Sequence, residues 1–325
     1  MTDFFNSTLS MIGQTPLFEV TQLETGPCRL FLKLENQNPG GSIKDRIALS
    51  MIEAAEKEGK LKPGGTIVEA TAGNTGIALG LVAGLKGYKL KIVMPDKMSA
   101  EKIAHLRALG AEVIMTRSDV TKGHPDYYQD KAKKMAETME NAFYIDQFNN
   151  PANPLAHEQS TAPEIFEQMD HDVDAIICGV GSGGTLSGIG HYFKKHSPKT
   201  QMIIADPVGS IIADMVNTGK HQESGSWLVE GVGEDFVPSI CDLSLASKGY
   251  YVSDQESFQT AYDLLRLEGI LGGSSTGTLL GGALKYCHEQ TTPKRVVTFV
   301  CDTGNKYLSK MFNQAWLEQQ GIAIR

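Results

Sequence analysis

A lysine in a glycine-rich turn is the residue of this sequence most suited to covalent chemistry. Lys44 follows Gly40-Gly41-Ser42-Ile43 and precedes a segment whose apolar residues recur at helical spacing. The amine therefore lies at the start of an amphipathic helix. If it points into a cleft, desolvation lowers its pKa and leaves it nucleophilic, so that it can form a Schiff base with an aldehyde cofactor. The alternative is a solvated loop lysine without chemistry.

Two later turns have the backbone amides needed to bind the anionic parts of such a cofactor and its substrate. The turn 71–76 follows a predicted strand and opens a predicted helix, so its amides and the helix dipole favour a carboxylate. Its Asn74 could also bind a ring hydroxyl. The loop 179–185 has four glycines in the same strand-to-helix position, which favours a phosphate. Together with Lys44, these turns predict pyridoxal phosphate as the cofactor.

Each turn also has a less specific interpretation. The turn 71–76 could be a plain Asn or Thr cap, and the turn 271–277 could be a plain N-cap with a serine at 274 or 275. The loop 179–185 also matches the GxGxxG pattern, and Asp206 ends the next predicted strand. This loop taken alone could therefore equally bind a dinucleotide.

The composition is that of an ordinary globular protein. The 325 residues are 41% hydrophobic and 21% charged, and the net charge of -8 comes from interspersed acids, so we expect neither a nucleic-acid nor a membrane partner. The N-terminal residues lack the pattern of a secretory signal, so we expect a cytoplasmic protein. The five cysteines form no CxxC pair and the eight histidines no HExxH pattern, so no metal site is predicted.

Apolar segments alternate with segments of helical period along most of the chain. Strands are predicted at 66–69, 89–94, 111–115, 175–178, 202–205 and 295–300, and helices at 74–85, 99–109, 124–141, 153–168, 185–196, 255–268 and 275–289. This alternation predicts an α/β fold with parallel sheets covered by helices on both faces, and with ligands beyond the carboxyl ends of the strands.

Two prolines near the middle of the chain indicate a domain crossing. Pro151 and Pro154 interrupt the alternating pattern. We therefore expect a larger, cofactor-anchoring domain of residues 1–45 and 151–325, and a smaller mobile domain of residues 46–150.

Four motifs in order, spread over nearly the whole chain, resemble those of the fold-type II pyridoxal-phosphate enzymes of the cysteine synthase and cystathionine β-synthase group. They are GGSIKDR, EATAGNTG, GVGSGGT and GGSSTG. The resemblance implies two open, mostly parallel sheets covered by helices, like the tryptophan synthase β-subunit, and a homodimer. It implies that Lys44 is the catalytic Schiff-base lysine, and that the other cofactor-binding residues are Asn74, Gly181, Ser182, Gly183, Gly184, Thr185 and Ser274. The substrate-binding residues that it implies are Thr71, Ala72, Gly73, Asn74, Thr75, Gln147 and Gly231.

Within that group, the segments 206–210, 230–238 and 302–309 are similar to the cystathionine β-synthase branch, whereas Ala72 and Phe148 depart from the common pattern. The resemblance implies that serine or O-acetylserine condenses with homocysteine to cystathionine. Cysteine synthase activity, with O-acetylserine and sulfide, is the nearest alternative, and an NAD-binding oxidoreductase and a non-catalytic scaffold are more remote. Because the chain ends soon after Trp316 and begins shortly before its first motif, we expect neither C-terminal regulatory repeats nor a haem module.

Overall fold

The chain forms two compact units in the computed structural model, which describes residues 4–96, 100–121 and 123–325. Unit 1 comprises Met1–Ile12 and Lys44–Asn153, and unit 2 comprises Gly13–Ile43 and Pro154–Arg325. Each unit contains its own sheet. The domain ranges expected from the sequence remain our proposal for the independently moving parts of the chain.

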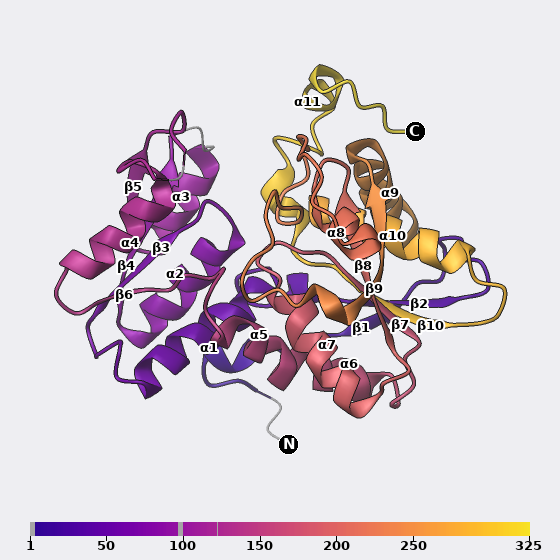
Figure 1. Ribbon diagram of the computed structural model, residues 1–325, viewed down its shortest axis with the longest axis horizontal. Coiled ribbons are helices and arrows are strands. Elements are labelled where there is room, and N and C mark those ends of the chain that lie inside the picture. The colour runs from indigo at the N-terminus through magenta and orange to yellow at the C-terminus, as the bar shows by residue number, and fades with distance from the viewer. Residues whose placement is uncertain (1–3, 97–99, 122) are drawn as a thin grey trace. The chain divides into compact units, whose positions relative to one another are not determined.

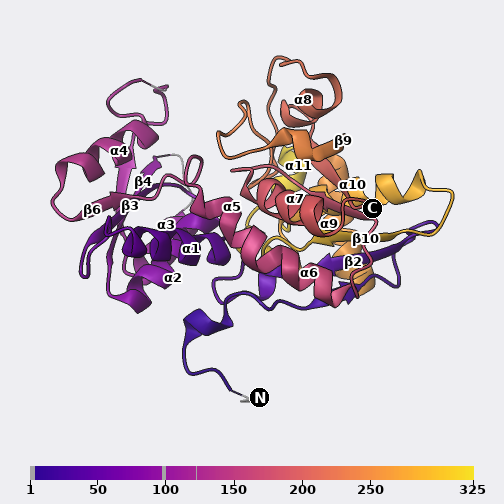
Figure 2. The ribbon, with the colours of Figure 1, turned by 60° about the horizontal axis from the view of Figure 1, so that its bottom comes forward.

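Unit 1 is built on a four-stranded parallel sheet with the strand order β5-β4-β3-β6. Its strands are β3 (Thr66–Ala70), β4 (Lys89–Pro95), β5 (Glu112–Thr116) and β6 (Ala142–Tyr144), and its α-helices are α1 (Lys44–Lys57), α2 (Asn74–Lys86), α3 (Ala100–Ala108) and α4 (Tyr128–Thr138). Figure 2 shows α4 on one face of the sheet and α1, α2 and α3 on the other. Every residue of β3 is buried, as expected for a central parallel strand covered on both faces.

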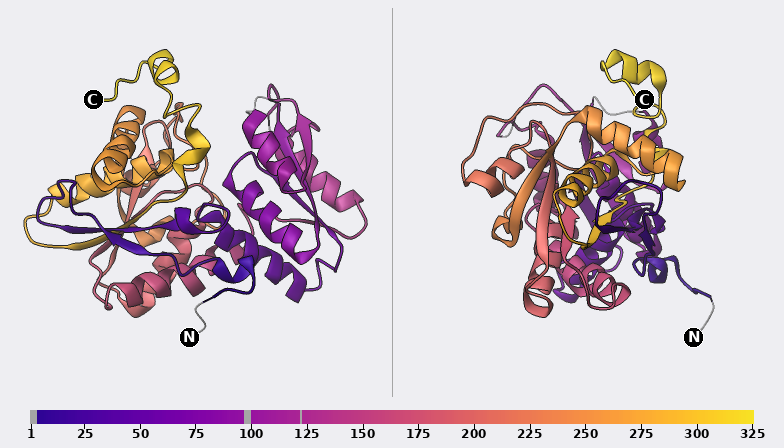
Figure 3. Two further views of the ribbon diagram at one scale, coloured as in Figure 1. Left: turned by 180° about the vertical axis from the view of Figure 1, so that it is seen from behind. Right: turned by 90° about the vertical axis from the view of Figure 1, so that its right-hand side faces the viewer.

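Unit 2 is built on a six-stranded sheet with the order β1-β2-β10-β7-β8-β9, in which only the β1–β2 pair is antiparallel. Its strands are β1 (Leu17–Glu19), β2 (Arg29–Lys33), β7 (Ala175–Cys178), β8 (Gln201–Pro207), β9 (Ala246–Val252) and β10 (Arg295–Phe299). Its helices are α6 (Ala162–Gln168), α7 (Gly184–His196), α8 (Ile212–Thr218), α9 (Asp254–Glu268), α10 (Ser274–His288) and α11 (Gln314–Gln319). Figure 3 shows β2, in indigo, beside β10, in yellow, although they come from opposite ends of the chain.

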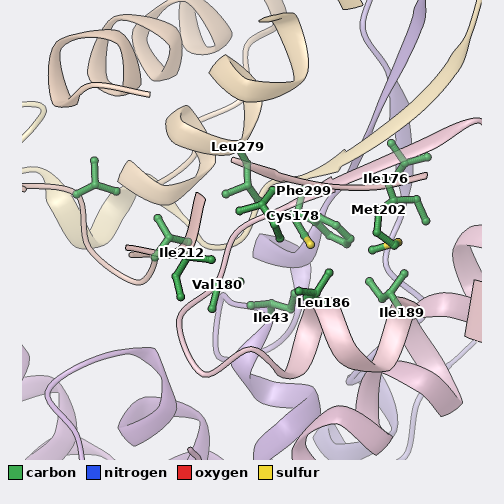
Figure 4. Close-up of a cluster of buried hydrophobic side chains, with 14 of the residues drawn as sticks. Ile43, Ile176, Cys178, Val180, Leu186, Ile189, Met202, Ile212, Leu279 and Phe299 are labelled. Atoms are coloured by element: carbon green, nitrogen blue, oxygen red, sulfur yellow. The ribbon is translucent and has the colours of Figure 1, made fainter. Parts of the chain in front are cut away.

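Alternate strand residues of unit 2 enter two different core layers. Ile176 and Cys178 of β7 pack in one layer with Leu186 of α7 (Figure 4). Ile177, between them, packs in the other layer with Leu280 of α10. Figure 1 accordingly shows α6 and α7 on one side of these strands and α9 and α10 on the other. Because both faces are buried, these strands are continuous apolar runs in the sequence.

The predicted α/β fold with two mostly parallel sheets is confirmed. Two helices differ from their predictions. The predicted helix 153–168 contains a π-helical turn, His157–Thr161, between α5 (Ala152–Ala156) and α6. The predicted helix 124–141 is shortened to α4, and Asn141 at its expected end has a φ of +52°, which is outside the helical region. Ser99, the expected start of α3, lies outside the described residues.

Candidate active site

The candidate Schiff-base lysine, Lys44, is the first residue of α1 in unit 1. Ile47, Met51 and Ile52 are fully or almost fully buried on the inward face of this helix. The amphipathic helix expected after Lys44 is therefore present. Its buried face anchors the helix and places the lysine at the N-terminal end.

The turn between β3 and α2 carries the predicted substrate-binding residues and presents a helix N-terminus. Gly73 is the N-cap of α2 and has no side chain that could accept a hydrogen bond from the amides of the first turn. Neither Asn74 nor Thr75 is therefore a plain cap. A Cβ added at Gly73 would meet no atom within 4 Å, so the space in front of the turn is open. This arrangement suits an anionic ligand.

Gln147 is held beside this turn by hydrogen bonds within unit 1. Its side-chain oxygen accepts a hydrogen bond from the hydroxyl of Thr75 at 2.7 Å, and its backbone carbonyl accepts one from the side chain of Asn153 at 2.8 Å. Because Thr75 occupies the amide oxygen, the amide nitrogen is the end suited to donate to a ligand. The structure thus brings together Thr75 and Gln147, which are far apart in the sequence.

The glycine-rich loop of unit 2 connects β7 to α7 and packs too tightly for side chains at several positions, of which Gly181 and Gly183 are two. A Cβ at Gly181 would lie 2.8 Å from the carbonyl oxygen of Gly231, and one at Gly183, where φ is +85°, would lie 2.3 Å from the Cβ of Cys241. Gly183 is the N-cap of α7 and has no side chain that could cap this helix. The backbone amides and the helix dipole form a donor set that suits a phosphate dianion. All the predicted phosphate-binding residues lie in this loop or the first turn of α7: Gly181, Ser182, Gly183, Gly184 and Thr185.

Ser274 is the first residue of α10 and is 2% exposed. The N-cap of this helix is Gly273, so the interpretation of Ser274 as a plain N-cap is wrong. Its hydroxyl oxygen accepts a hydrogen bond from the backbone amide of Glu230 at 3.0 Å. The hydroxyl proton is then suited to an acceptor such as a pyridine nitrogen. Unit 2 thus brings Ser274 together with the segment that carries Gly231.

Asp206, the residue on which a dinucleotide site would depend, is committed to the protein backbone. It is fully buried, and its carboxylate accepts a hydrogen bond at 2.9 Å from the amide of Ala213 in α8. Burial raises the pKa of this carboxyl to about 6, against the effect of its hydrogen bonds with Ala213 and Ser210. A carboxylate held in this way is not presented to a ribose, and the geometry disfavours the NAD interpretation.

Two polar residues near the predicted site were missed by sequence reasoning. His157 of the π-helical turn has its Nδ1 2.9 Å from the hydroxyl of Thr161 and its Nε2 3.4 Å from the hydroxyl of Thr185. No sequence signal marks this turn, because 153–168 has the pattern of one continuous helix. Glu69 is 1% exposed inside β3, and a glutamate within an apolar strand is the signal that could have identified it.

Neither a metal-binding cluster nor a membrane-spanning helix occurs in the part of the chain that the structure describes. Among those residues, no three His, Cys, Asp or Glu side chains are grouped closely enough to hold a metal ion. Over the same ranges, no helix is long and apolar enough to cross a membrane.

The chain belongs to the family described as pyridoxal-phosphate dependent enzymes, whose model matches residues 8–302. A cystathionine beta-synthase of Apis mellifera is 42% identical over 97% of this chain and 62% of its own length. Cysteine synthase 1 of Emericella nidulans is 39% identical over 98% of this chain and 88% of its own length. The chain also matches the crystal structure of a hydrogen sulfide-producing enzyme from Fusobacterium nucleatum, with a TM-score of 0.86 and 38% sequence identity. This match covers 94% of this chain and 100% of that one.

These similarities show that the chain is an enzyme of pyridoxal-phosphate fold type II. The donor sets described above fit the cofactor: an amine at Lys44, backbone amides at the start of α7 for the phosphate and a neutral hydroxyl at Ser274 for the ring. The chain matches 62% of the length of the Apis mellifera β-synthase.

Proposed function

We propose that this chain catalyses a β-replacement, in which serine or O-acetylserine condenses with homocysteine to form cystathionine, a transsulfuration step. The observation that carries the proposal is the hydroxyl of Ser274, fixed by the amide of Glu230 at 3.0 Å. A neutral donor leaves the cofactor's ring nitrogen largely unprotonated, which weakens the electron sink and favours elimination over transamination. The β-synthase and cysteine synthase relatives support the same class of reaction.

Lys44 has two roles in this proposal. Bound pyridoxal phosphate supplies the electron sink that makes the Cα proton of an amino acid acidic. Lys44 first holds the cofactor covalently, and after the substrate amine displaces it, the freed lysine removes the Cα proton as a general base. Lys44 can then give this proton to the departing β-substituent. The thiol of homocysteine passes its own proton to Lys44 as its sulfur bonds to Cβ, and Lys44 returns that proton to Cα.

The other predicted site residues bind and orient. The loop 181–185 holds the phosphate and Asn74 contacts the ring hydroxyl. The turn formed by Thr71, Ala72, Gly73, Asn74 and Thr75 holds the substrate carboxylate together with Gln147. The hydrogen bond between Thr75 and Gln147 supports a joint carboxylate site, and the position of Gly231 against Gly181 supports its place beside the substrate.

Cysteine synthase activity is the second candidate. It is favoured by the Emericella nidulans relative, which the chain matches over 88% of that protein's length, and by Phe148, which departs from the pattern of the β-synthase branch. Initial rates with serine plus homocysteine and with O-acetylserine plus sulfide separate the two functions. We expect cystathionine to form faster than cysteine. The opposite order assigns the protein to the second candidate.

The cofactor linkage has its own test. We expect a visible absorption band that borohydride removes, and we expect Lys44→Ala to abolish the band while the protein stays folded. Mass spectrometry of the reduced, digested protein should find the pyridoxyl group on Lys44, and a label on another lysine contradicts the assignment. The expected homodimer is tested separately by analytical ultracentrifugation, and the expected cytoplasmic location by fractionation.

A further inference from the structure

Three successive backbone amides of unit 2 are bound by side chains that lie at the start of two helices. The amide of Leu228 donates to both carboxyl oxygens of Asp254 at 3.0 Å, and the amide of Val229 donates to one of them at 3.2 Å. The next amide, that of Glu230, donates to the hydroxyl of Ser274 at 3.0 Å. Asp254 therefore binds the chain directly before the amide that binds Ser274.

Asp254 is the first residue of α9, but other residues cap this helix. The hydroxyl of Ser253 accepts a hydrogen bond from the amide of Glu256 at 3.2 Å, and the carboxylate of Glu256 accepts one from the amide of Ser253 at 2.8 Å. This reciprocal pair is a capping box. The carboxyl group of Asp254 is thus turned to amides outside its own helix.

The chain around these amides depends on such side-chain acceptors for its position. The segment 219–242, all of whose residues the structure describes, contains neither a helix nor a strand. Its backbone lacks the regular hydrogen bonds of those elements, so acceptors on rigid neighbours must fix it. Because one residue advances the chain by at most about 3.6 Å, two fixed amides narrowly restrict the position of the third.

The hydroxyl of Ser274 needs a fixed donor in order to point its proton in one direction. A serine hydroxyl has one proton and two acceptor lone pairs, and it rotates to suit its partners. Ser274 is buried, so the partners that the protein supplies decide this rotation. The amide of Glu230 occupies one side of the oxygen and leaves the proton to an acceptor on another. If that amide shifts, the hydroxyl can rotate away from the acceptor.

We propose that Asp254 is a positioning residue for the cofactor's ring: it places the amide of Glu230 on Ser274, whose proton is thereby directed to the ring nitrogen. This proposal rests on the ring contact of the function proposed above. The alternative is that Asp254 only stabilises the fold, in which case its loss would weaken the binding of every form of the cofactor alike. A ligand that lacks the ring nitrogen separates the two.

Competition between pyridoxal phosphate and its deaza analogue on Asp254→Ala tests the proposal. The analogue has a C–H group in place of the ring nitrogen and keeps the aldehyde and the phosphate. The holoenzyme is equilibrated with an excess of both ligands at equal concentration and reduced with borohydride, and mass spectrometry gives the share of each. We expect the wild type to prefer pyridoxal phosphate about ten-fold, because the analogue leaves the buried proton of Ser274 without an acceptor. In Asp254→Ala we expect the preference to fall to about two-fold or less.

Two further variants serve as controls. Asp263 lies on the same helix and accepts a hydrogen bond from the side chain of Gln259 at 2.9 Å, so Asp263→Ala should keep the wild-type preference. Ser274→Ala should lose the preference, and adding Asp254→Ala should lower it no further. Such non-additive effects are expected of two residues that act through one contact.

Two outcomes overturn the proposal in distinguishable ways. If the wild type prefers pyridoxal phosphate and Asp254→Ala keeps that preference, the role of Asp254 is purely structural and the proposed function is untouched. If the wild type binds both ligands equally, the ring contact of the proposed function fails and the role of Asp254 fails with it.

Asp254→Asn takes the place of the alanine variant if that variant does not fold. Asparagine has the same shape and one acceptor oxygen, but its amide nitrogen sets a donor against an N–H group that the carboxylate accepted. We expect the preference for pyridoxal phosphate to fall about three-fold from the wild-type value. A preference equal to that of the wild type overturns the proposal.

Discussion

Replacing Glu69 with glutamine should change how the stability of the protein depends on pH. Burial raises the pKa of Glu69 in the folded protein from its ordinary value of 4.5 to about 8. Between these values the unfolded chain has lost the proton while the folded protein still holds it. A folded state that binds more protons loses stability as the pH rises, so wild-type stability should decline across this window. Glutamine has no proton to lose and removes this contribution.

The size of the effect follows from the two pKa values. A difference of one between the folded and unfolded pKa corresponds to about 1.4 kcal/mol, and the linkage integral between about pH 5 and about pH 8 comes to about 3 kcal/mol. We therefore expect the free energy of unfolding of Glu69→Gln, relative to wild type, to rise by about that amount over this range. An unsatisfied amide group in the variant would lower its free energy of unfolding equally at both pH values. The change in the free energy of unfolding between the two pH values would therefore be unaltered.

Urea denaturation followed by circular dichroism measures this difference at the two pH values. The exposed Glu137→Gln should stay within about 0.5 kcal/mol of wild type at both. If the free-energy difference between Glu69→Gln and wild type is the same at the two pH values, Glu69 is ionised in the folded protein and the predicted proton on its carboxyl is refuted.

The remaining predictions concern two helical glycines and Ser274. Gly277→Ala should destabilise the protein by about 3 kcal/mol or more, because the new Cβ would lie 1.9 Å from the carbonyl oxygen of Ser257 in α9. Gly84→Ala in α2 is the control: no atom lies within 4 Å of the new Cβ, so this change should stabilise the protein by about 0.5–1 kcal/mol. If both variants move the midpoint of urea unfolding in the same direction, this account is contradicted. Ser274→Asp should lower kcat about 100-fold or more, because a carboxylate would keep the ring nitrogen protonated. Turnover within two-fold of wild type, with the cofactor bound, contradicts the role of the neutral hydroxyl.

Local patterns were sufficient to predict much of the fold. The runs 66–70 and 175–178 are apolar because helices cover both faces of their sheets, and each is followed by a glycine turn at a helix N-terminus. Periodicity did not identify four strands, namely β1, β2, β6 and β9. Of these, β1 and β6 have three residues each, too few for a pattern to emerge. The π-helical turn was not predictable, because its one extra residue leaves the helical pattern intact.

Site residues could be predicted where their role depends on the local backbone conformation. They could not be predicted where their role depends on burial by segments that are distant in the sequence. Glycines 181 and 183 are necessary because of neighbours at 231 and 241, yet their strand-to-helix position alone indicated a loop of exposed amides. The raised pKa of Glu69 depends on desolvation and on the negative charge of Asp146, which lies far along the chain. The position of Glu69 in the sequence therefore shows only that an acid occurs in an apolar strand.

A buried acid lies near the carboxyl end of a central strand in each unit. Glu69 in β3 accepts a hydrogen bond from the amide of Ala70 at 2.8 Å, and Asp206 in β8 accepts one from the amide of Ala213 at 2.9 Å. The hydroxyl of Ser210, four residues after Asp206, accepts a hydrogen bond from the amide of Glu234 at 3.0 Å, in the segment that carries Gly231. Loops at strand ends have few backbone partners of their own, so a carboxyl that accepts an amide hydrogen bond there fixes the chain without a covalent link. In each unit, burial has raised the pKa of this carboxyl.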